Sequence, residues 1–406
     1  MRELVGALRS YAWGSRTALA QLCGRPVPSA HPEAELWFGA HPADPAHVVH
    51  EGATRSLVEV LADDPVRELG SVANSFGTRL PFLLKILAAE EPLSLQAHPS
   101  SAQAKTGFER ENRLGVALDS PLRNYRDDSH KPELVVALER FEALAGFRDP
   151  HRTVDLLRAL DVPGLNVYAE LLAAQPDSAG LRTLFTTWIT LPPAALAKLL
   201  PAVLEGCVRY LSTKGEHEFG AEVRTALELA EVYPGDAGVL AALLLNRLTL
   251  EPGQALFLAA GNLHAYLRGV GVEIMANSDN VLRGGLTPKH VDVPELLHVL
   301  DFEPIDLPVI EPEPGGDGSV RYRTPAPEFA LCRFDLDADD EPVVLADAGP
   351  SIVLCTAGTV ELSENGRTLT IERGSAAWIS AADTDIKARA VRGPAQLFSA
   401  CVGDGN

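Results

Sequence analysis

The feature that most constrains the fold is a change of hydrophobic spacing in the middle of the 406-residue chain. Between about residues 152 and 247, apolar side chains recur three and four positions apart, as in the segment 221–229. This is the period of an amphipathic helix. Breakers such as Pro192-Pro193 divide the stretch into several helices. The sequence therefore predicts an all-helical insertion, which we place at residues 148–249.

The segments on either side of this insertion have the texture of β-structure. Short apolar runs alternate with frequent Pro and Gly, and the segments 359–363 and 367–371 flank an Asn-Gly turn that predicts a hairpin. We therefore expect a mainly β protein with an α-helical insertion. Its first domain would be formed by residues 1–147 and 250–303, and a second, smaller β domain would follow at 304–406.

Charge and cysteine content limit the possible partners. The formal net charge is −20, and because nucleic-acid binding needs a basic face, we expect no nucleic-acid partner. Any phosphate ligand would need a local cluster of cations. No apolar run is long enough to span a bilayer and no signal peptide is visible, so we expect a cytoplasmic protein without a membrane partner. The five cysteines are scattered, which argues against disulfides and a thiolate metal site.

The first polar cluster lies in the segment 92–99. In a strand, residues i and i+2 point to the same face, so Ser94, Gln96 and His98 would share one side. An amide oxygen beside an imidazole nitrogen suits a divalent metal. Taken alone, however, such a pattern is more often a polar strand face, because short motifs are weak evidence.

The second cluster is the His-Lys-Pro-Glu segment at residues 130–133. By the same alternation Lys131 and Glu133 share a face, and Pro132 fits the start of an edge strand. Glu133 is a candidate carboxylate ligand, and Lys131 is a candidate for binding a substrate hydroxyl or for proton transfer. The ordinary alternative is a surface ion pair of little energetic value.

The third cluster runs from residue 261 to residue 289. His264 sits where a strand meets a Gly-Asn turn, a position typical of metal ligands in small β-barrels, although such a residue is often only structural. The polar, Gly-rich segment 277–289 is unsuited to a packed helix or strand. We therefore expect a loop that carries Arg283 and Lys289 as an oxyanion or phosphate clamp.

Two features of composition indicate where the chemistry lies. No histidine follows His298, so a histidine-ligated metal site must lie before the last hundred residues. The chain has seven lysines against 28 arginines, and three of the seven, Lys85, Lys131 and Lys289, fall in or beside the clusters. Lysine is a compact charge with an adjustable pKa, which suggests roles there that arginine could not fill.

Together, and in this order, the clusters resemble the type I phosphomannose isomerases. The motifs that carry the resemblance are Gln-x-His-Pro at 96–99, Lys-Pro-Glu at 131–133 and Asp-Asn-Val-x-Arg-x-Gly-x-Thr-Pro-Lys at 279–289, with further matches at 11–15 and 34–42. The resemblance covers the whole chain. It implies a catalytic domain that is a cupin-type β-barrel (jelly roll), a helical domain inserted into it, and a second, smaller β domain.

The resemblance also implies the site residues and one Zn²⁺ ion per chain. The expected zinc ligands are Gln96, His98, Glu133 and His264. The expected catalytic arginine is Arg283, and the expected phosphate-binding groups include Ser94 and Lys289. Further polar positions of the family pocket fall on Lys85, Lys131 and Glu273.

The reaction implied is the interconversion of mannose 6-phosphate and fructose 6-phosphate. It moves a proton between C2 and C1 through a cis-enediol intermediate, which needs charge stabilisation and a positioned acid and base. Glu273, Lys131 and His130 are all candidates for the proton transfer, and the sequence does not rank them. We expect a small-molecule sugar phosphate as the ligand and a monomeric protein.

Three other functions remain to be weighed against the isomerase. A non-catalytic sugar-phosphate-binding cupin would keep the same pocket, but the sequence has no DNA-binding or signalling module to transmit such a signal. An O₂-using metal cupin would have little use for Arg283, Lys289 and Ser94 together. A bifunctional nucleotidyltransferase type of phosphomannose isomerase would need an N-terminal Gly-rich nucleotide loop, and none is visible.

Overall fold

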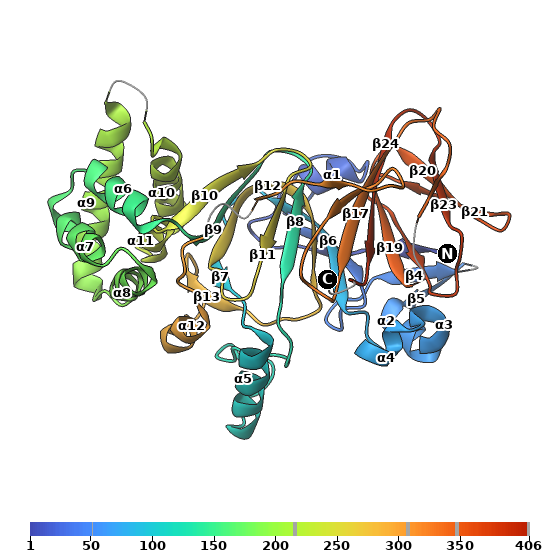
Figure 1. Ribbon diagram of the computed structural model, residues 1–406, viewed down its shortest axis with the longest axis horizontal. Helices are drawn as coiled ribbons and strands as arrows, with labels where there is room; N and C mark the ends of the chain where they lie inside the picture. The colour runs from blue at the N-terminus through green and yellow to red at the C-terminus, as the bar shows by residue number, and fades with distance from the viewer. Residues whose placement is uncertain (51, 214–216, 306–308, 346–348, 404–406) are drawn as a thin grey trace.

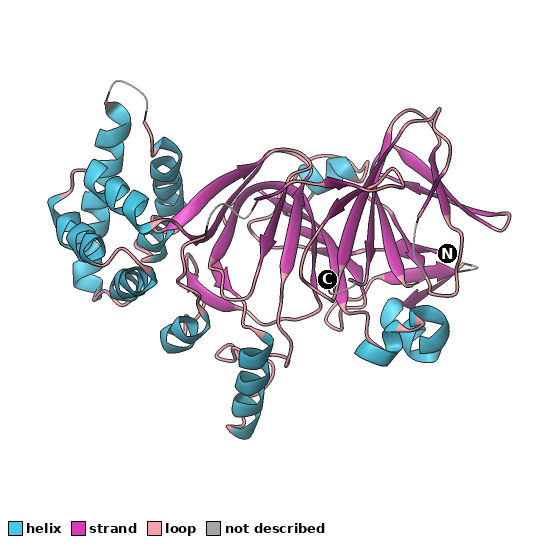
Figure 2. Cartoon of the chain, viewed as in Figure 1, coloured by secondary structure: helices cyan, strands magenta, loops and turns pink. Residues whose placement is uncertain are grey.

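The computed structural model describes residues 1–406 except 51, 214–216, 306–308, 346–348 and 404–406. It is mainly β, with a group of helices at one end and further helices beside the sheets (Figures 1 and 2). The predicted mainly β chain with added helices is therefore confirmed.

The larger sheet has eleven strands and is organised around the long strand β12 (His264–Ala276). The first residues of β12 pair with β9 (Phe141–Phe147), and the rest pair with β6 (Phe82–Ala89) and β8 (Glu133–Ala137). The change of partner occurs at Gly269, whose φ of 132° favours glycine and where a Cβ would lie 2.8 Å from the β9 backbone. The other strands are β2 (Ala7–Arg9), β3 (Glu35–Gly39), β7 (Leu95–Ala97), β10 (Leu245–Leu250), β11 (Ala255–Leu258), β13 (Leu282–Gly285) and β14 (Val309–Ile310).

A second sheet, of nine strands, joins the two ends of the chain. Strand β1 (Arg2–Val5) lies between β22 (Ala376–Ile379) and β4 (His47–His50), and it is antiparallel to both. This sheet therefore contains strands from both sides of the domain boundary predicted at residue 304. Its remaining strands are β5 (Ala53–Ser56), β15 (Glu313–Pro314), β16 (Val320–Tyr322), β17 (Ala330–Leu336), β19 (Ser351–Ala357) and β24 (Ala395–Cys401).

A small third sheet contains the predicted hairpin. Strands β20 (Thr359–Glu364) and β21 (Arg367–Glu372) pair around Asn365 and Gly366, which have φ values of 46° and 81°. Positive φ at both turn residues matches the right-handed twist of the paired strands, so the hairpin prediction is confirmed. Strands β18 (Val343–Val344) and β23 (Lys387–Ala390) complete the sheet.

Among the described residues, six helices lie between β9 and β10, in the stretch with helical spacing. Asp149 and Asp177 start two of them, each accepting a hydrogen bond from a backbone N–H three residues on. Phe185 and Trp188 are fully buried in a core that continues under β9. Among the described residues, the helical prediction is confirmed up to residue 242, whereas residues 245–249 belong to strand β10, and residues 214–216 of the predicted stretch lie outside the described residues. The helices are α6 (Pro150–Ala159), α7 (Pro163–Ala174), α8 (Ser178–Ile189), α9 (Pro193–Ser212), α10 (Gly220–Val232) and α11 (Gly238–Ala242).

No single helix in the described part of the chain is long and apolar enough to cross a membrane. Helices α8 and α9 meet that test only when taken together, across a bend of 109°. The other helices lie beside the sheets (Figure 1). They are α1 (Ala18–Leu22), α2 (Leu57–Asp63), α3 (Pro65–Leu69), α4 (Val72–Phe76), α5 (Ser101–Arg113) and α12 (Val293–Val299).

The prediction that Pro132 starts an edge strand is wrong. Strand β8 is an inner strand that pairs with both β11 and β12. Pro132 is tolerated there because it lies just before the strand, where no ladder partner needs its missing N–H. Its carbonyl accepts a hydrogen bond from the backbone N–H of Ala276 at 3.1 Å.

Glu68 of α3 contacts residues from both ends of the chain. This buried carboxylate accepts a hydrogen bond from Trp378 Nε1 at 2.7 Å and forms an ion pair with Arg2. We expect Glu68→Ala to lower the free energy of unfolding by about 1–3 kcal/mol, because the buried indole N–H loses its acceptor. Urea unfolding measures the difference. Glu59→Ala, at an exposed position on α2, is the control, and equal losses in the two variants would contradict the prediction.

Candidate metal centre and anion pocket

The short strand β7 brings residues of two sequence clusters together. Gln96 of β7 lies opposite His264 of β12 on one side and opposite Arg283 of β13 on the other. The strand covers only three residues, so Ser94 and His98 flank it instead of lying within one longer strand as predicted. The pairing nevertheless places the first and third clusters side by side.

The segment 277–289 is not a loop throughout, and that prediction is wrong. Residues 282–285 form β13, which pairs with β7. Gly285 has a φ of 120°, and a Cβ there would lie 2.8 Å from the Cα of Gly238. Glycine at this position therefore permits a strand that packs directly against the backbone of the helical insertion.

Three buried side chains converge beside β7, and together they can hold a metal ion. Candidate ligand atoms of His98, Glu133 and His264 all lie within 4.8 Å of one another. The Nε2 atoms of the two histidines lie 3.3 Å and 3.5 Å from the two carboxylate oxygens of Glu133. All three residues are buried. Two imidazoles and one carboxylate are a common ligand set for zinc.

The two histidines are oriented by backbone carbonyls. Nδ1 of His98 donates a hydrogen bond to the carbonyl of Asn280 at 2.7 Å, and Nδ1 of His264 donates to that of Asn262 at 3.0 Å. Because a carbonyl only accepts, the proton sits on Nδ1 and the Nε2 lone pair is free. Nε2 of His98 is buried without a hydrogen-bond partner among the described residues. An unpartnered lone pair in this position fits a metal ligand.

The charges of this cluster are set by burial and by Lys131. Burial lowers the pKa of His98 to about 4, so its imidazole is neutral at neutral pH. Burial alone would raise the pKa of Glu133. The ammonium of Lys131, whose Nζ lies 2.9 Å from Glu133 Oε1, instead holds that pKa well below its usual range. Neutral imidazoles and an ionised carboxylate are the protonation states that metal binding requires.

A second group of buried charges surrounds Lys85 of β6. Its ammonium donates to Glu273 at 2.9 Å and lies 3.5 Å from Glu35, which also accepts from Trp37 Nε1. Tyr266 donates to the other oxygen of Glu273 at 2.8 Å. Burial raises the pKa of Glu273 even though Lys85 opposes the shift. Because Lys85 and Glu35 also line the main pocket, this group connects Glu273 to it.

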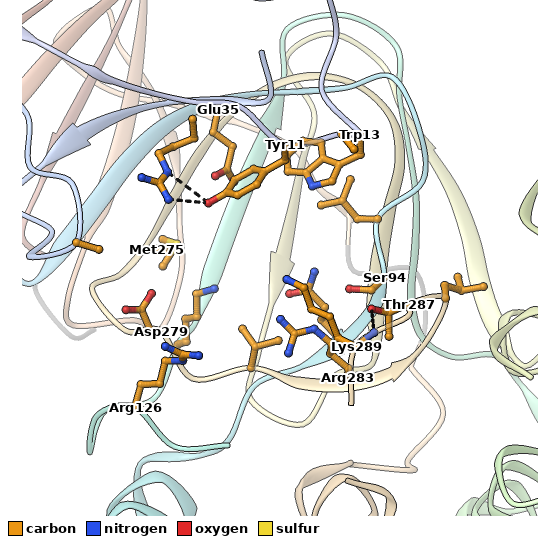
Figure 3. Close-up of a pocket in the computed structure, with 18 of the residues that line it drawn as sticks. Tyr11, Trp13, Glu35, Ser94, Arg126, Met275, Asp279, Arg283, Thr287 and Lys289 are labelled. Atoms are coloured by element: carbon orange, nitrogen blue, oxygen red, sulfur yellow. Dashed lines mark hydrogen bonds between the residues drawn. The ribbon is translucent and has the colours of Figure 1, made fainter. Parts of the chain in front are cut away.

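A cavity of about 670 Å³ opens beside the two charged groups (Figure 3). It is lined by Ser94 and Gln96 and also by the aromatic side chains of Tyr11 and Trp13, which Figure 3 draws away from Ser94. The acids that line it are Glu35 and Asp279, whereas cations are in excess. The lining cations are Arg9, Lys85, Arg123, Arg126, Lys131, Arg283 and Lys289. In a chain with a net charge of −20, this is a local anion site.

Three of the lining cations, Arg126, Arg283 and Lys289, have no carboxylate of a described residue within 4.0 Å. Figure 3 places Arg283 and Lys289 near Ser94, while Arg126 lies across the view from them, beside Asp279. Burial lowers the pKa of Lys289, and the charges of Arg283 and Arg126 lower it further. Burial lowers the pKa of Arg283 as well, again with a contribution from Arg126. Unpaired cations that repel one another are suited to a multiply charged anion.

Of the residues singled out in the sequence, His130 lies apart from the others. Its Nε2 is 2.6 Å from Glu328 Oε1, and the pair lines a separate cavity together with Arg79 and Asn277. His130 precedes Lys131 directly, but it lines the other cavity while Lys131 lines the main one. Sequence proximity placed His130 among the candidates, and the fold turns it toward the C-terminal part of the chain.

Sequence reasoning missed several residues that line the pocket or contact the candidates. Each of them lies in or near one of the motifs, but the spacing of residues in the sequence provides no reason to single it out. Arg126 precedes the second cluster by a few residues, and Tyr266 follows His264 on the same strand. The missed residues are Glu35, Trp37, Arg126, Tyr266, Asp279 and Asn280.

Comparison with known proteins identifies the family. Residues 1–150 match the family model of the phosphomannose isomerase type I catalytic domain. The chain is 38% identical over 389 residues to the mannose-6-phosphate isomerase of Escherichia coli, an alignment that covers 95% of this chain and 96% of that protein. The chain belongs to the type I phosphomannose isomerase family. The resemblance seen in the sequence motifs is thereby confirmed.

Further members of the phosphomannose isomerase family agree over nearly the full length. The mannose-6-phosphate isomerase of Salmonella typhimurium is 37% identical over 402 residues, which covers 98% of this chain and all of that protein. A crystal structure of the Salmonella isomerase bound to its substrate, fructose 6-phosphate, and to zinc matches with a TM-score of 0.90 at 36% identity. The match covers 99% of both chains, so the agreement extends across the sheets and the helical insertion.

The charged group around Lys85 makes stability depend on pH in a testable way. Lys85→Met leaves Glu35 and Glu273 buried without their cation, so we expect a loss of about 3–5 kcal/mol in the free energy of unfolding at neutral pH. The pKa of Glu273 is already raised in the folded state and would rise further. The folded variant then binds more protons than the unfolded chain, so its stability falls as the pH rises through that pKa.

The measurement is urea unfolding of the variant and the wild type at about pH 5 and about pH 8. The loss in free energy of unfolding caused by Lys85→Met should be larger at the higher pH. Lys105→Met, at an exposed position on α5, provides the control for loss of a lysine. A deficit that is equal at both pH values, or that grows toward low pH, would contradict the assignment of buried, unpaired carboxylates.

Proposed function

We propose that this chain interconverts mannose 6-phosphate and fructose 6-phosphate with the help of one bound zinc ion. The observation that carries the proposal is a buried His-Glu-His cluster beside a pocket with unpaired cations. A metal that acts on sugar oxygens and a site for a phosphate dianion are the two parts that such a reaction needs. Membership of the type I phosphomannose isomerase family supports the same reaction, as do the substrate and zinc held by a relative of the same fold.

The zinc ligands we propose are His98, Glu133 and His264, with Gln96 as the fourth. The first three bring two imidazole nitrogens and one carboxylate within reach of a single ion. Gln96 is assigned because it lies opposite His264 in the sheet and also lines the pocket, so it stands between the cluster and the substrate space. When bound, the zinc would act as a Lewis acid that polarises the sugar oxygens.

The phosphate group is assigned to Lys289 and Ser94, and the charge that develops on the sugar to Arg283. A hydroxyl and an ammonium near one another suit a phosphate, and Arg283 lies on the strand that pairs with Gln96. A fixed guanidinium stabilises an enediolate oxygen without reorganising during the reaction. Holding the phosphate at the far end of the substrate converts binding energy into orientation of C1 and C2.

Proton transfer between C1 and C2 is assigned to groups that can reach the pocket. Lys131 lines it directly and is anchored by Glu133, so it can hold a proton at a sugar oxygen. Glu273 lies behind Lys85, and it can exchange a proton with the pocket through that lysine. His130 is left out of this assignment, because it is paired with Glu328 and lines the separate cavity.

We further propose that the sheet around β12 is a cupin-type barrel and that the helices between β9 and β10, within residues 148–249, form a separate inserted domain. We also propose that the strands of residues 304–406 form most of the second β domain, which β1, β4 and β5 complete. The jelly-roll assignment is supported by the antiparallel pairing of the strands of the eleven-stranded sheet. All proposed site residues come from one chain, which supports a monomeric enzyme.

NMR spectroscopy of fructose 6-phosphate in D₂O tests the proposed reaction. With the purified, zinc-loaded protein, mannose 6-phosphate should appear and should carry deuterium at C2, because the proton added there comes from an acid that exchanges with solvent. Chelation should stop the reaction, and added zinc should restore it. Bound zinc without any mannose 6-phosphate would overturn the isomerase proposal.

Removal of the histidines tests the ligand assignment. His98→Ala and His264→Ala should each lose bound zinc by at least about an order of magnitude in affinity, since a first ligand matters at least as much as the residues behind it. Elemental analysis after dialysis and zinc titration of the apoprotein measure the loss independently of turnover. His298→Ala, at an exposed position on α12, is the matched control and should keep its zinc. Stoichiometric, tightly bound zinc in both site variants would show that the ligand set is wrong.

A further inference from the structure

We propose that Arg126 is a third phosphate-binding side chain of the pocket, held in place by the buried residue Asn280. The inference rests on the proposed function, because it names a further contact to the phosphate of the same substrate. Arg126 belongs to none of the three sequence clusters. It precedes the His-Lys-Pro-Glu segment and enters the pocket from the loop before β8.

The first argument is that the Arg126 guanidinium lines the pocket without an ion-pair partner. No carboxylate of a described residue lies within 4.0 Å of it. The acid drawn beside it in Figure 3, Asp279, lies 3.4 Å from Nε2 of His41, and the charge of Arg126 contributes to the lowered pKa of Asp279 without a contact within 4.0 Å. Arg123 makes the contrast clear, since it lines the same pocket but its guanidinium donates to the carbonyls of Tyr125 and Val116. Arg123 has a structural role, whereas Arg126 has its donors available.

The second argument is electrostatic. Arg126 acts on Arg283 and Lys289 strongly enough to contribute to the lowered pKa of both. Arg126 is thus a cationic neighbour of the two partly buried cations, and no carboxylate of a described residue lies within 4.0 Å of any of the three. A phosphate dianion relieves the repulsion between these cations, and the planar guanidinium can offer it two parallel hydrogen bonds.

The third argument is that hydrogen bonds fix the backbone at Arg126, although its side chain is exposed. Its backbone N–H donates to Oδ1 of Asn280 at 2.7 Å. The amide of Asn280, which is 0% exposed, also donates to the carbonyls of Asp127 at 2.9 Å and Ser129 at 2.8 Å. An exposed arginine on an unsupported loop would carry no such restraint.

Asn280 also connects Arg126 to the metal centre. Its carbonyl accepts the Nδ1–H of His98, so one buried residue orients a proposed zinc ligand and fixes the backbone from which Arg126 extends. Asn280 therefore fixes the backbone of Arg126 relative to the imidazole of His98. A substrate held at both ends needs the distance between the metal and the phosphate contacts to be constant.

Steady-state kinetics and orthophosphate binding test the proposal with Arg126→Gln and Arg126→Lys. Losing a charged hydrogen bond to phosphate should raise the KM for fructose 6-phosphate by about 10- to 100-fold in Arg126→Gln. Competitive inhibition by inorganic phosphate should weaken by a similar factor. Arg126→Lys keeps the charge but not the paired donors, so its KM should lie between those of Arg126→Gln and the wild type. Bound zinc should stay stoichiometric in both variants.

Arg113→Gln is the matched control, because it removes one exposed positive charge from α5, outside the residues that line the pocket. A KM within about twofold of the control would overturn the proposal. So would a raised KM with unchanged phosphate inhibition, since Arg126 would then contact the sugar instead. If the wild type shows no turnover, the isomerase proposal fails separately. Calorimetric titration of wild type and Arg126→Gln with inorganic phosphate then still decides whether Arg126 binds the anion.

Discussion

The metal centre depends on the compensation of one buried charge, the carboxylate of Glu133. An isolated carboxylate at the start of an inner strand would cost several kcal/mol, and it stays ionised because the ammonium of Lys131 lies 2.9 Å from it. The imidazoles of His98 and His264 lie on its other side. Those partners come from the segments around β7, β8 and β12, which meet only when the eleven-stranded sheet has its observed pairing. The strand pairing that forms the fold therefore also positions the side chains of the candidate metal centre.

The neighbouring pocket has the opposite arrangement. Around Glu133 and Lys85 each buried charge has a partner, whereas Arg126, Arg283 and Lys289 lack a carboxylate within 4.0 Å in the described part of the chain. The paired charges around Glu133 and Lys85 hold their geometry in the free protein, whereas the three pocket cations would gain a charged partner only when an anion binds. A chain with a net charge of −20 thus concentrates positive charge where a phosphorylated substrate is proposed to bind, and this draws the substrate to one place on an otherwise repelling surface.

Much of this could be predicted from local patterns. Helical spacing predicted the insertion, the Asn-Gly turn predicted the hairpin, and alternation along short segments singled out Gln96, His98 and Glu133. The errors concern long-range pairing: β8 is an inner strand despite Pro132, and residues 282–285 form a strand despite two glycines. Glu35 and Asn280 were missed because their roles depend on partners far away in the sequence, such as Lys85 and His98. Local spacing carries no information about such contacts.

The place of β1 in the nine-stranded sheet has a consequence for biosynthesis. This first strand is hydrogen-bonded on one side to β4, but its other neighbour, β22, begins only at Ala376. A ribosome makes a chain from its N-terminus, so one edge of β1 stays open until Ala376–Ile379 have emerged. An open edge is a template for unwanted pairing, which makes this strand the place where chaperone protection would matter most. Strand β22 is thus the segment whose synthesis closes the open edge of β1.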